Sequence, residues 1–170
     1  MKLPKIFLPF VLLMVITALL RLYQLHAIPE GFHSDEAAFG YNAYSLLKTG
    51  RDEYGKRFPL VLTSFGDDKG ALYSYATIPF VALLGLNETA VRLPTALGGI
   101  LFVIIIYLLA FELTKNTKTS FLVSSVASLS PVGIVLSRVQ SDPLLCVVML
   151  TASIYWFVKW VRTRHIVDYS

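Results

Sequence analysis

Residues 33–50 read HSDEAAFGYNAYSLLKTG, and the rest of the chain is organised around this stretch. Ser34 is a favoured N-cap residue, and Asp35 and Glu36 fall in the first turn, where free N–H groups and the helix dipole attract negative charge. Apolar residues then recur at helical spacing, and Gly50 is a residue type that commonly follows a helix end. The stretch therefore predicts a helix that begins with paired carboxylates. Acidic residues open many surface helices for stability alone, so only the location of this pair can give it a chemical meaning.

The composition is that of a membrane protein. The 170 residues are 55% hydrophobic and 15% charged, and the mean hydropathy is +0.64. Long apolar runs, rather than an alternating pattern, supply this hydrophobicity, which is typical of integral membrane proteins. A net charge of +4 would suggest nucleic-acid binding in a soluble protein. Here the basic residues cluster at the ends of apolar runs, where they indicate topology, so we expect no nucleic-acid partner.

Four long apolar runs predict transmembrane helices, at about residues 6–25, 93–113, 120–137 and 143–161. The first also has the shape of a signal peptide, but its length and the poor cleavage site after it favour an uncleaved span. A shorter apolar segment, residues 71–86, is interrupted by polar residues and a proline. If it does not cross, the basic residues of the remaining loops face the cytoplasm, as the positive-inside rule prefers. We therefore predict four spans and an external loop over residues 26–92, in which residues 71–86 lie along the outer interface or dip into it.

This topology brings polar residues from three separate places to the outer face of the membrane. They are Asp35, Glu36, Asp67, Asp68, Lys69 and Asp142. Carboxylates at a membrane edge often mark a pathway or a site. Taken alone, residues 67–69 equally suggest a solvated turn, and Asp142 before Pro143 equally suggests a helix start with aspartate as the N-cap. Their common side indicates a shared role.

These residue types suit sugar transfer from a lipid-linked phosphate. Asp35 or Glu36 can act as the general base that deprotonates an acceptor hydroxyl or amine. Lys69 suits a phosphate oxygen at the level of the lipid headgroups. The leaving phosphate requires stabilisation of its charge, while the acceptor requires a base, so this set matches both demands.

A divalent cation is a further expectation for the same place. Asp68 and Asp142 can bind such an ion through carboxylate oxygens, with Glu36 or His33 as a third ligand. His33 is equally explained as a polar residue at the interface. The cation is therefore the one cofactor that the sequence suggests.

The order of these motifs resembles the amino-terminal part of the GT-C membrane glycosyltransferases. The shared features are a first span, D-E opening an external helix, D-K before an apolar aromatic segment, LGLNETAVRLPTALGG leading into a span, and S-D-P at the next outer turn. The most similar group comprises the protein O-mannosyltransferases and the lipid A aminoarabinose transferases. The resemblance covers about residues 19–160.

The resemblance implies an all-α integral membrane enzyme with a GT-C-like fold, about four spans here, and juxtamembrane helices in a large first external loop. Such enzymes sit in the cell membrane and transfer a sugar, with inversion, from a polyprenyl phosphate to a protein, lipid or glycan on the extracytoplasmic side. By this resemblance Asp35 activates the acceptor and Glu36 is its frequent neighbour. Lys69, in its pair with Asp68, contacts the carrier phosphate, and Arg92 of A-V-R-L-P has a structural or headgroup role.

Two features keep other interpretations open. Known members of the group have more spans, so residues 1–170 are expected to form the amino-terminal part of a multi-span domain and to be inactive alone. The alternative function is a non-enzymatic transporter or flippase component, in which charges inside the membrane line a path. The charges of this chain gather at one surface instead, which favours chemistry at the interface. A small structural protein would leave Asp35, Asp68 and Asp142 with no common reason to face one side.

Overall fold

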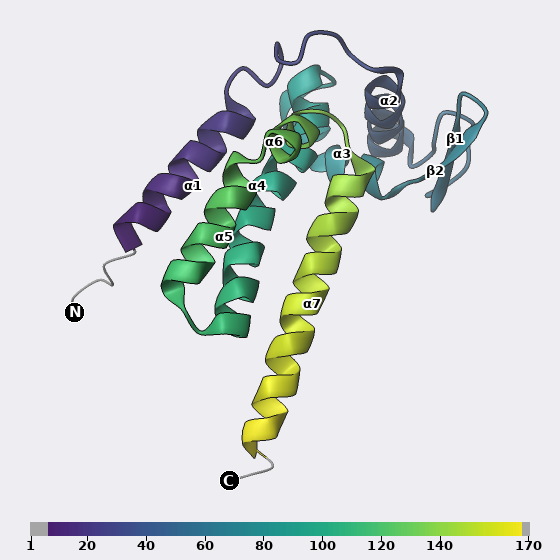
Figure 1. Ribbon diagram of the computed structural model, residues 1–170. Helices are drawn as coiled ribbons and strands as arrows, with labels where there is room; N and C mark the ends of the chain where they lie inside the picture. The colour runs from purple at the N-terminus through teal and green to yellow at the C-terminus, as the bar shows by residue number, and fades with distance from the viewer. Residues whose placement is uncertain (1–6, 168–170) are drawn as a thin grey trace.

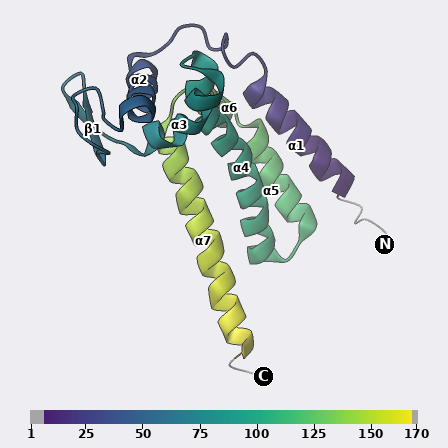
Figure 2. The ribbon, with the colours of Figure 1, turned by 180° about the vertical axis from the view of Figure 1, so that it is seen from behind.

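The computed structural model describes residues 7–167, which form helices and one short hairpin. In chain order the elements are α1 (Phe7–Leu22), α2 (Ser34–Thr49), β1 (Val61–Ser64), β2 (Asp67–Gly70), α3 (Leu72–Leu84), α4 (Glu88–Thr114), α5 (Thr117–Leu129), α6 (Pro131–Arg138) and α7 (Asp142–Val167). Helices α1, α4, α5 and α7 form an elongated bundle, and α2, α3 and the hairpin gather at one end of it (Figure 1). Seen from behind, the segment between α1 and α2 arches over that same end (Figure 2).

Helix α4 is the centre of the fold and contacts every other helix. Two glycines allow close approach to it. A Cβ added at Gly99, within α4, would lie 2.6 Å from the Cβ of Ser137 on α6. A Cβ added at Gly40 on α2 would lie 2.6 Å from a methyl carbon of Val91 on α4. Small residues at these crossings therefore let both α6 and α2 pack directly on α4.

Within residues 7–167, two helices are long and apolar enough to cross a membrane, α4 and the Asp142–Thr163 part of α7. The bent pair of α5 and α6 would make a third span. Helix α1 is apolar but shorter, with 16 residues, and so is α3 with 13. The prediction that most of the chain is helical is confirmed, and two or three of the predicted spans are supported by helices long and apolar enough to cross a membrane. The count of four spans requires α1 as well, so it stays a prediction.

The predicted span over residues 120–137 is not one unbroken helix, because the helix breaks at Ser130. Helices α5 and α6 are bent by 56° relative to each other. Pro131 has no N–H to continue the first helix, and it suits the first turn of the next. The Ser130 hydroxyl caps that new helix by accepting a hydrogen bond from the Gly133 N–H at 3.3 Å.

The external region is more ordered than the sequence indicated. Residues 33–50 form the predicted helix, and Gly50 follows it in the left-handed conformation, with φ of 67°. Residues 67–69, for which a solvated turn was one of two interpretations, belong to strand β2, which pairs antiparallel with β1. The predicted juxtamembrane segment forms α3. One buried apolar cluster joins α2, the hairpin, α3 and α4, and it contains Phe39, Leu62, Ala71, Tyr73 and Val91.

Candidate active site

An ion pair between Asp35 and Lys69 links the first turn of α2 to strand β2. The Asp35 side chain remains 40% exposed, whereas that of Lys69 is only 15% exposed. The Lys69 ammonium also lies 5.8 Å from the centre of the Phe39 ring, a distance typical of a cation–π contact. Lys69 is therefore held between an aromatic face and a carboxylate, while Asp35 keeps an open side.

Asp142 joins this pair from a third element, since it is the first residue of α7. It lies close enough to Asp35 and to Lys69 to interact electrostatically with both, and the Gln140 side chain donates a hydrogen bond to it. Its predicted role as N-cap is wrong. The Ser141 hydroxyl caps α7 instead, by accepting a hydrogen bond from the Leu144 N–H at 3.3 Å. The Asp142 carboxylate therefore does not cap its own helix and lies near the other two charges.

Glu36, the neighbour of Asp35, is buried and fully engaged. Its carboxylate accepts hydrogen bonds from Nε and Nη2 of Arg92 at 2.8 and 3.0 Å, and from the backbone N–H groups of His33 and Gln140 at 3.0 and 3.1 Å. Burial by itself raises the pKa of Glu36, but these hydrogen bonds and the Arg92 charge outweigh it, so the pKa lies below its usual value. Glu36 is thus held ionised, with its oxygen atoms already occupied.

Arg92 completes this buried junction. Besides Glu36, it donates to the carbonyl oxygens of Leu25, Pro29 and Gly31 at 3.0, 3.1 and 2.6 Å. The guanidinium therefore ties the segment after α1 to α4, and Glu36 ties both to α2. The structural role expected for Arg92 agrees with this arrangement.

His33 is the N-cap of α2, so the prediction that Ser34 caps this helix is wrong. The His33 Nδ1 accepts a hydrogen bond from the Asp35 N–H at 3.3 Å, and Glu36 bonds back to the His33 N–H to complete a capping box. Histidine is an uncommon cap, and Ser34 offered the more usual residue type. The glutamate three positions after His33 was the signal that placed the cap one residue earlier.

Asp68 does not share the location of Asp35, Lys69 and Asp142. In the hairpin, Asp68 lies opposite Thr63, and its carboxylate accepts a hydrogen bond from the Thr63 hydroxyl at 2.8 Å. Side chains alternate along a strand, so Asp68 and Lys69 project from opposite faces of the hairpin. Among the residues that the structure describes, no group of three or more His, Cys, Asp or Glu side chains is placed to hold a metal. We therefore derive no step through the expected cation.

Two pockets with both polar and apolar walls open near the first turn of α2. One, of about 280 Å³, is lined by His33, Asp35, Glu36, Val139 and Gln140. The other, of about 360 Å³, shares His33, Glu36 and Val139 with it and extends along the segment from Pro29 to Phe32. The smaller pocket, which Asp35 lines, offers an approach to this residue.

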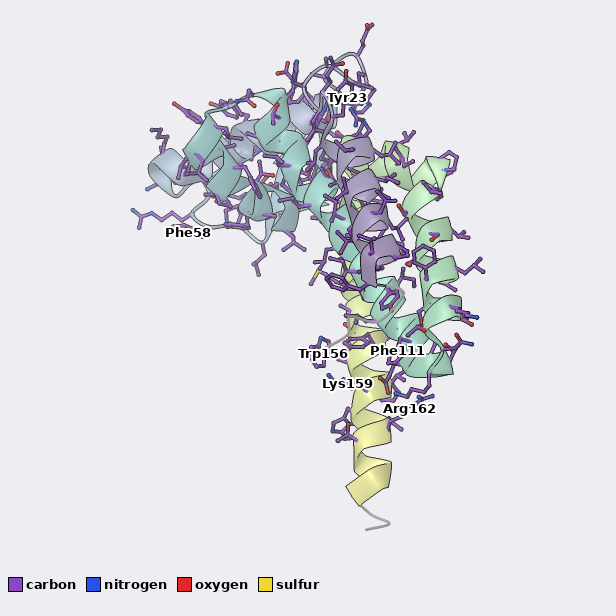
Figure 3. The ribbon with its side chains drawn as sticks, turned by 90° about the vertical axis from the view of Figure 1, so that its left-hand side faces the viewer. Tyr23, Phe58, Phe111, Trp156, Lys159 and Arg162 are labelled. Atoms are coloured by element: carbon purple, nitrogen blue, oxygen red, sulfur yellow. The ribbon has the colours of Figure 1, made fainter. Side chains whose placement is uncertain are left out.

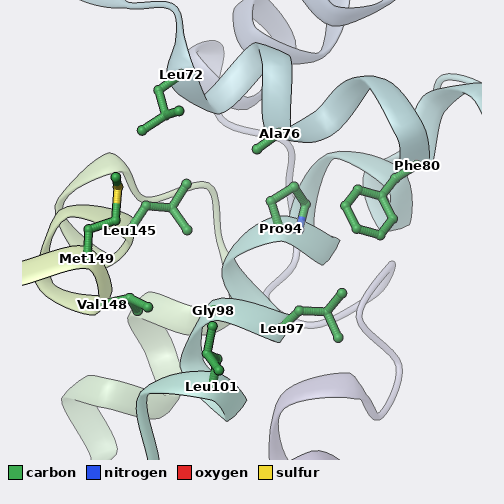
Figure 4. A pocket seen from close by; sticks show the side chains of 10 residues that line it. All are labelled: Leu72, Ala76, Phe80, Pro94, Leu97, Gly98, Leu101, Leu145, Val148 and Met149. Atoms are coloured by element: carbon green, nitrogen blue, oxygen red, sulfur yellow. The ribbon is translucent and has the colours of Figure 1, made fainter. Parts of the chain in front are cut away.

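An apolar groove of about 370 Å³ lies between α3, α4 and α7, and we call it the lipid-side groove. Its lining is almost wholly apolar, as the close view shows (Figure 4): Leu72, Ala76, Phe80, Pro94, Leu97, Gly98, Leu101, Leu145, Val148 and Met149. Leu72 follows Lys69 by three positions, and Leu145 follows Asp142 by three. The groove therefore begins close to Asp35, Lys69 and Asp142, which we call the charged cluster, and continues along the candidate spans.

Two residues of this region carried no signal in the sequence. Gln140 bonds Glu36 through its backbone N–H and Asp142 through its side chain, so it connects the buried junction with the charged cluster. Arg138 donates to the carbonyl oxygens of Leu20, Tyr23 and Ile28 and fixes the end of α1. Both lie in the short polar segment before Asp142. This interruption between two apolar runs was the one feature of the sequence that set the segment apart.

A helical membrane protein with a charged site at one end of its candidate spans is the class that fold and site define. The chain belongs to the family of dolichyl-phosphate-mannose-protein mannosyltransferases, since the sequence model of this family matches residues 11–166. No individual curated protein and no solved structure shows a significant match. Membership confirms the resemblance and implies a glycosyltransferase with a polyprenyl-phosphate-linked donor. It supports this interpretation over a transporter or flippase component.

Proposed function

We propose that this chain supplies the base and the phosphate contact for transfer of a sugar, with inversion, from a polyprenyl phosphate to an acceptor at the extracytoplasmic face of the membrane. The observation that carries the proposal is the position of Asp35, Lys69 and Asp142. They lie together between the smaller pocket, which suits the acceptor, and the lipid-side groove, which suits the carrier.

The donor is expected to bind with its phosphate at Lys69. The ammonium is partly buried and positioned by Phe39, so a phosphate oxygen would gain a charge-assisted hydrogen bond in a region of reduced water access. The polyprenyl chain then follows the lipid-side groove, whose wall is formed by Leu72, Leu145 and their neighbours. A groove with almost no polar surface offers nothing to a sugar and suits a hydrocarbon chain.

The acceptor is expected to enter through the smaller pocket, beside His33 and Asp35. Asp35 takes the proton of the acceptor hydroxyl or amine as the acceptor atom bonds to the anomeric carbon. The bond from that carbon to the phosphate oxygen breaks, and its electron pair leaves with the phosphate, where Lys69 stabilises the added charge. Because the acceptor and the phosphate occupy opposite sides of the sugar, the configuration inverts.

The two neighbouring carboxylates have different roles in this proposal. Asp35 is exposed on one side and pairs with a lysine that the donor phosphate would also contact, so donor binding releases its oxygen atoms for the acceptor. Glu36 is buried with its oxygens occupied by Arg92 and two backbone N–H groups, so we assign it to positioning. We assign Asp142 to substrate binding. Its carboxylate lies beside the base and can accept hydrogen bonds from hydroxyl groups of the sugar or the acceptor.

Transfer by the complete protein, reconstituted in vesicles with a polyprenyl-phosphate-linked mannose, tests this function. Hydroxyl-bearing peptides and lipids are offered in turn as acceptors. We expect release of polyprenyl phosphate together with a product of inverted anomeric configuration. Retention of configuration, or hydrolysis of the donor without transfer to any acceptor, would contradict the proposal.

The membrane side of the site is tested by cysteine labelling in a Cys146→Ser background. Asp67→Cys places a thiol on the exposed hairpin, and Thr117→Cys places one at the opposite end of the bundle, where α5 begins. A membrane-impermeant maleimide should label position 67 in intact cells and position 117 only after permeabilisation. The reverse order would place the site on the cytoplasmic side.

A further inference from the structure

The segment between α2 and β1, residues 50–60, exposes apolar side chains away from the bundle. Tyr54, Phe58 and Leu60 are 62%, 67% and 85% exposed. Beside them, the side chains of Arg51, Lys56 and Arg57 are also exposed. Aromatic and aliphatic residues mixed with cations are the composition that binds the interfacial zone of a bilayer. We call this segment the basic aromatic loop.

The basic aromatic loop has a fixed shape rather than an extended one. Its two ends are joined by a hydrogen bond from the Phe58 N–H to the Gly50 carbonyl at 3.1 Å, and Asp52 N–H donates to the Lys56 carbonyl at 3.0 Å. The Phe58 ring lies against Gly50, where a Cβ would come within 3.0 Å of it. The exposed side chains are therefore presented by a folded turn, which lowers the entropy lost on docking.

The two acidic residues of the loop accept hydrogen bonds from within the protein, and one of them is buried. Asp52 is buried, and its carboxylate accepts hydrogen bonds from the Tyr54 and Lys56 N–H groups at 3.0 and 2.8 Å. The Glu53 carboxylate accepts one from the Asn42 side chain at 3.2 Å. The loop exposes three cations against the one exposed carboxylate of Glu53, so its net outward charge is positive and complements an anionic surface.

The loop lies at the membrane-facing side of the external region. In side view, the helices of the external region overhang the bundle, and Phe58 lies near the lower edge of this overhang, toward the candidate spans (Figure 3). Helix α3, in the same overhang, exposes Leu83 and Leu84. The apolar surface of the candidate spans therefore continues onto this region.

We propose that the basic aromatic loop docks on the bilayer leaflet at the Asp35 end, with Phe58 and Leu60 in the interfacial zone and Arg51, Lys56 and Arg57 against anionic phospholipid headgroups. The exposed apolar side chains thereby leave water, and the cations gain counter-charges. Docking also anchors the hairpin that carries Lys69 at the level of the headgroups. The inference uses the membrane position of the chain and does not depend on the proposed reaction.

Depth-dependent quenching tests the docking. Cys146 is the one cysteine of the sequence, so Cys146→Ser gives a background for a single fluorophore at Phe58→Cys or Leu60→Cys. Asp67→Cys, on the exposed strand β2, is the matched control. Each labelled protein is reconstituted in vesicles of phosphatidylcholine, with or without phosphatidylglycerol, that contain lipids brominated on the acyl chain. Because the Leu60 side chain is highly exposed, its replacement should leave the packing intact. Position 60 therefore still tests the docking if Phe58→Cys disturbs the fold of the loop.

We expect quenching at positions 58 and 60 but not at 67, and stronger quenching when phosphatidylglycerol is present. Each exposed cation near an anionic surface should favour the docked state by roughly fivefold. The triple variant R51Q/K56Q/R57Q should therefore abolish the effect of phosphatidylglycerol. Quenching no greater at 58 and 60 than at 67 would overturn the proposal. The loop would then face water or bind another protein instead of the bilayer. If quenching is the same with and without phosphatidylglycerol, and the same in the triple variant, the proposed role of the cations is wrong.

Discussion

Glu36 and Arg92 form an ion pair in which both side chains are buried, and it joins α2 to α4 across 56 positions of the sequence. The two hydrogen bonds, of 2.8 and 3.0 Å, come from different nitrogens of one guanidinium and reach both carboxylate oxygens. Asp35 precedes Glu36, and Gln140, which donates to Glu36, also bonds Asp142. The pair is therefore linked to both Asp35 and Asp142, and it helps to fix the positions of these two carboxylates relative to each other.

Removing one partner of this pair should be costly. Glu36→Gln or Arg92→Met leaves a buried group uncompensated and is expected to destabilise the protein by about 3–5 kcal/mol. Arg92→Lys should recover little, because an ammonium cannot make two parallel hydrogen bonds to the carboxylate. Thermal unfolding in detergent measures the change, with Asp68→Asn as the control. Full stability of Glu36→Gln would show that the pair is not structural.

The same pair predicts an acid dependence. The pKa of Glu36 in the folded protein lies below the unfolded value of 4.5, so the contribution of the pair is complete above that pH. It is lost as the pH falls through the folded pKa, since the carboxylate then takes up a proton. The difference in melting temperature between the wild type and Glu36→Gln should be constant near neutral pH and shrink below 4.5. A difference that grows on acidification would contradict the assignment.

Lys69 is expected to act on the donor. Lys69→Ala should raise the KM for the polyprenyl-phosphate donor about tenfold to a hundredfold, the usual worth of a hydrogen bond to a charged group. The kcat should fall less, and Lys69→Arg should restore part of the donor affinity. Lys118→Ala, an exposed lysine at the other end of the bundle, is the matched control. An unchanged donor KM in Lys69→Ala would remove Lys69 from the phosphate site.

Asp142 and Asp68 should differ sharply in the same assay. Asp142→Asn removes a charge that interacts with both Asp35 and Lys69, so kcat/KM should fall about tenfold to a hundredfold. Asp68 projects from the other face of the hairpin and bonds Thr63, so Asp68→Asn should change kcat/KM by no more than about twofold. Equal losses in the two variants would contradict the structural separation of these residues and favour a shared cation site.

Local signals in the sequence were sufficient for several elements. The capping and C-terminal residues of 33–50 predicted α2, and the long apolar run after residue 93 predicted α4, although that helix begins at Glu88 behind the Asn87 cap. The apolar segment at residues 71–86 indicated α3, whose position along the membrane interface stays a prediction from charge counting. These features depend on short-range rules for caps, breakers and apolar length, which a single sequence carries.

Other features depend on contacts between distant segments and had no local signal. Strand β2 has the residues of a turn, Asp67–Gly70, and becomes a strand only by pairing with β1. The separation of Asp68 from Lys69 follows from that pairing, because alternation places neighbours on opposite faces. Likewise, the sequence alone does not distinguish the roles of Asp35 and Glu36. Glu36 has a structural role only because Arg92 of α4 forms an ion pair with it. The sequence could indicate that Asp35, Lys69 and Asp142 lie near one another, but not that Asp68 projects elsewhere or that Glu36 is held in a buried ion pair.

The most direct test of the account compares Asp35→Asn with Asp68→Asn in the transfer assay, with donor binding measured in parallel. Asp35→Asn should lower kcat by about a hundredfold to ten-thousandfold, the range that general-base catalysis contributes, while donor binding is not weakened and thermal stability stays close to that of the wild type. Asp68→Asn should transfer at a near-normal rate. Normal transfer by Asp35→Asn would contradict the assignment of the base and, with it, the proposed geometry of the reaction.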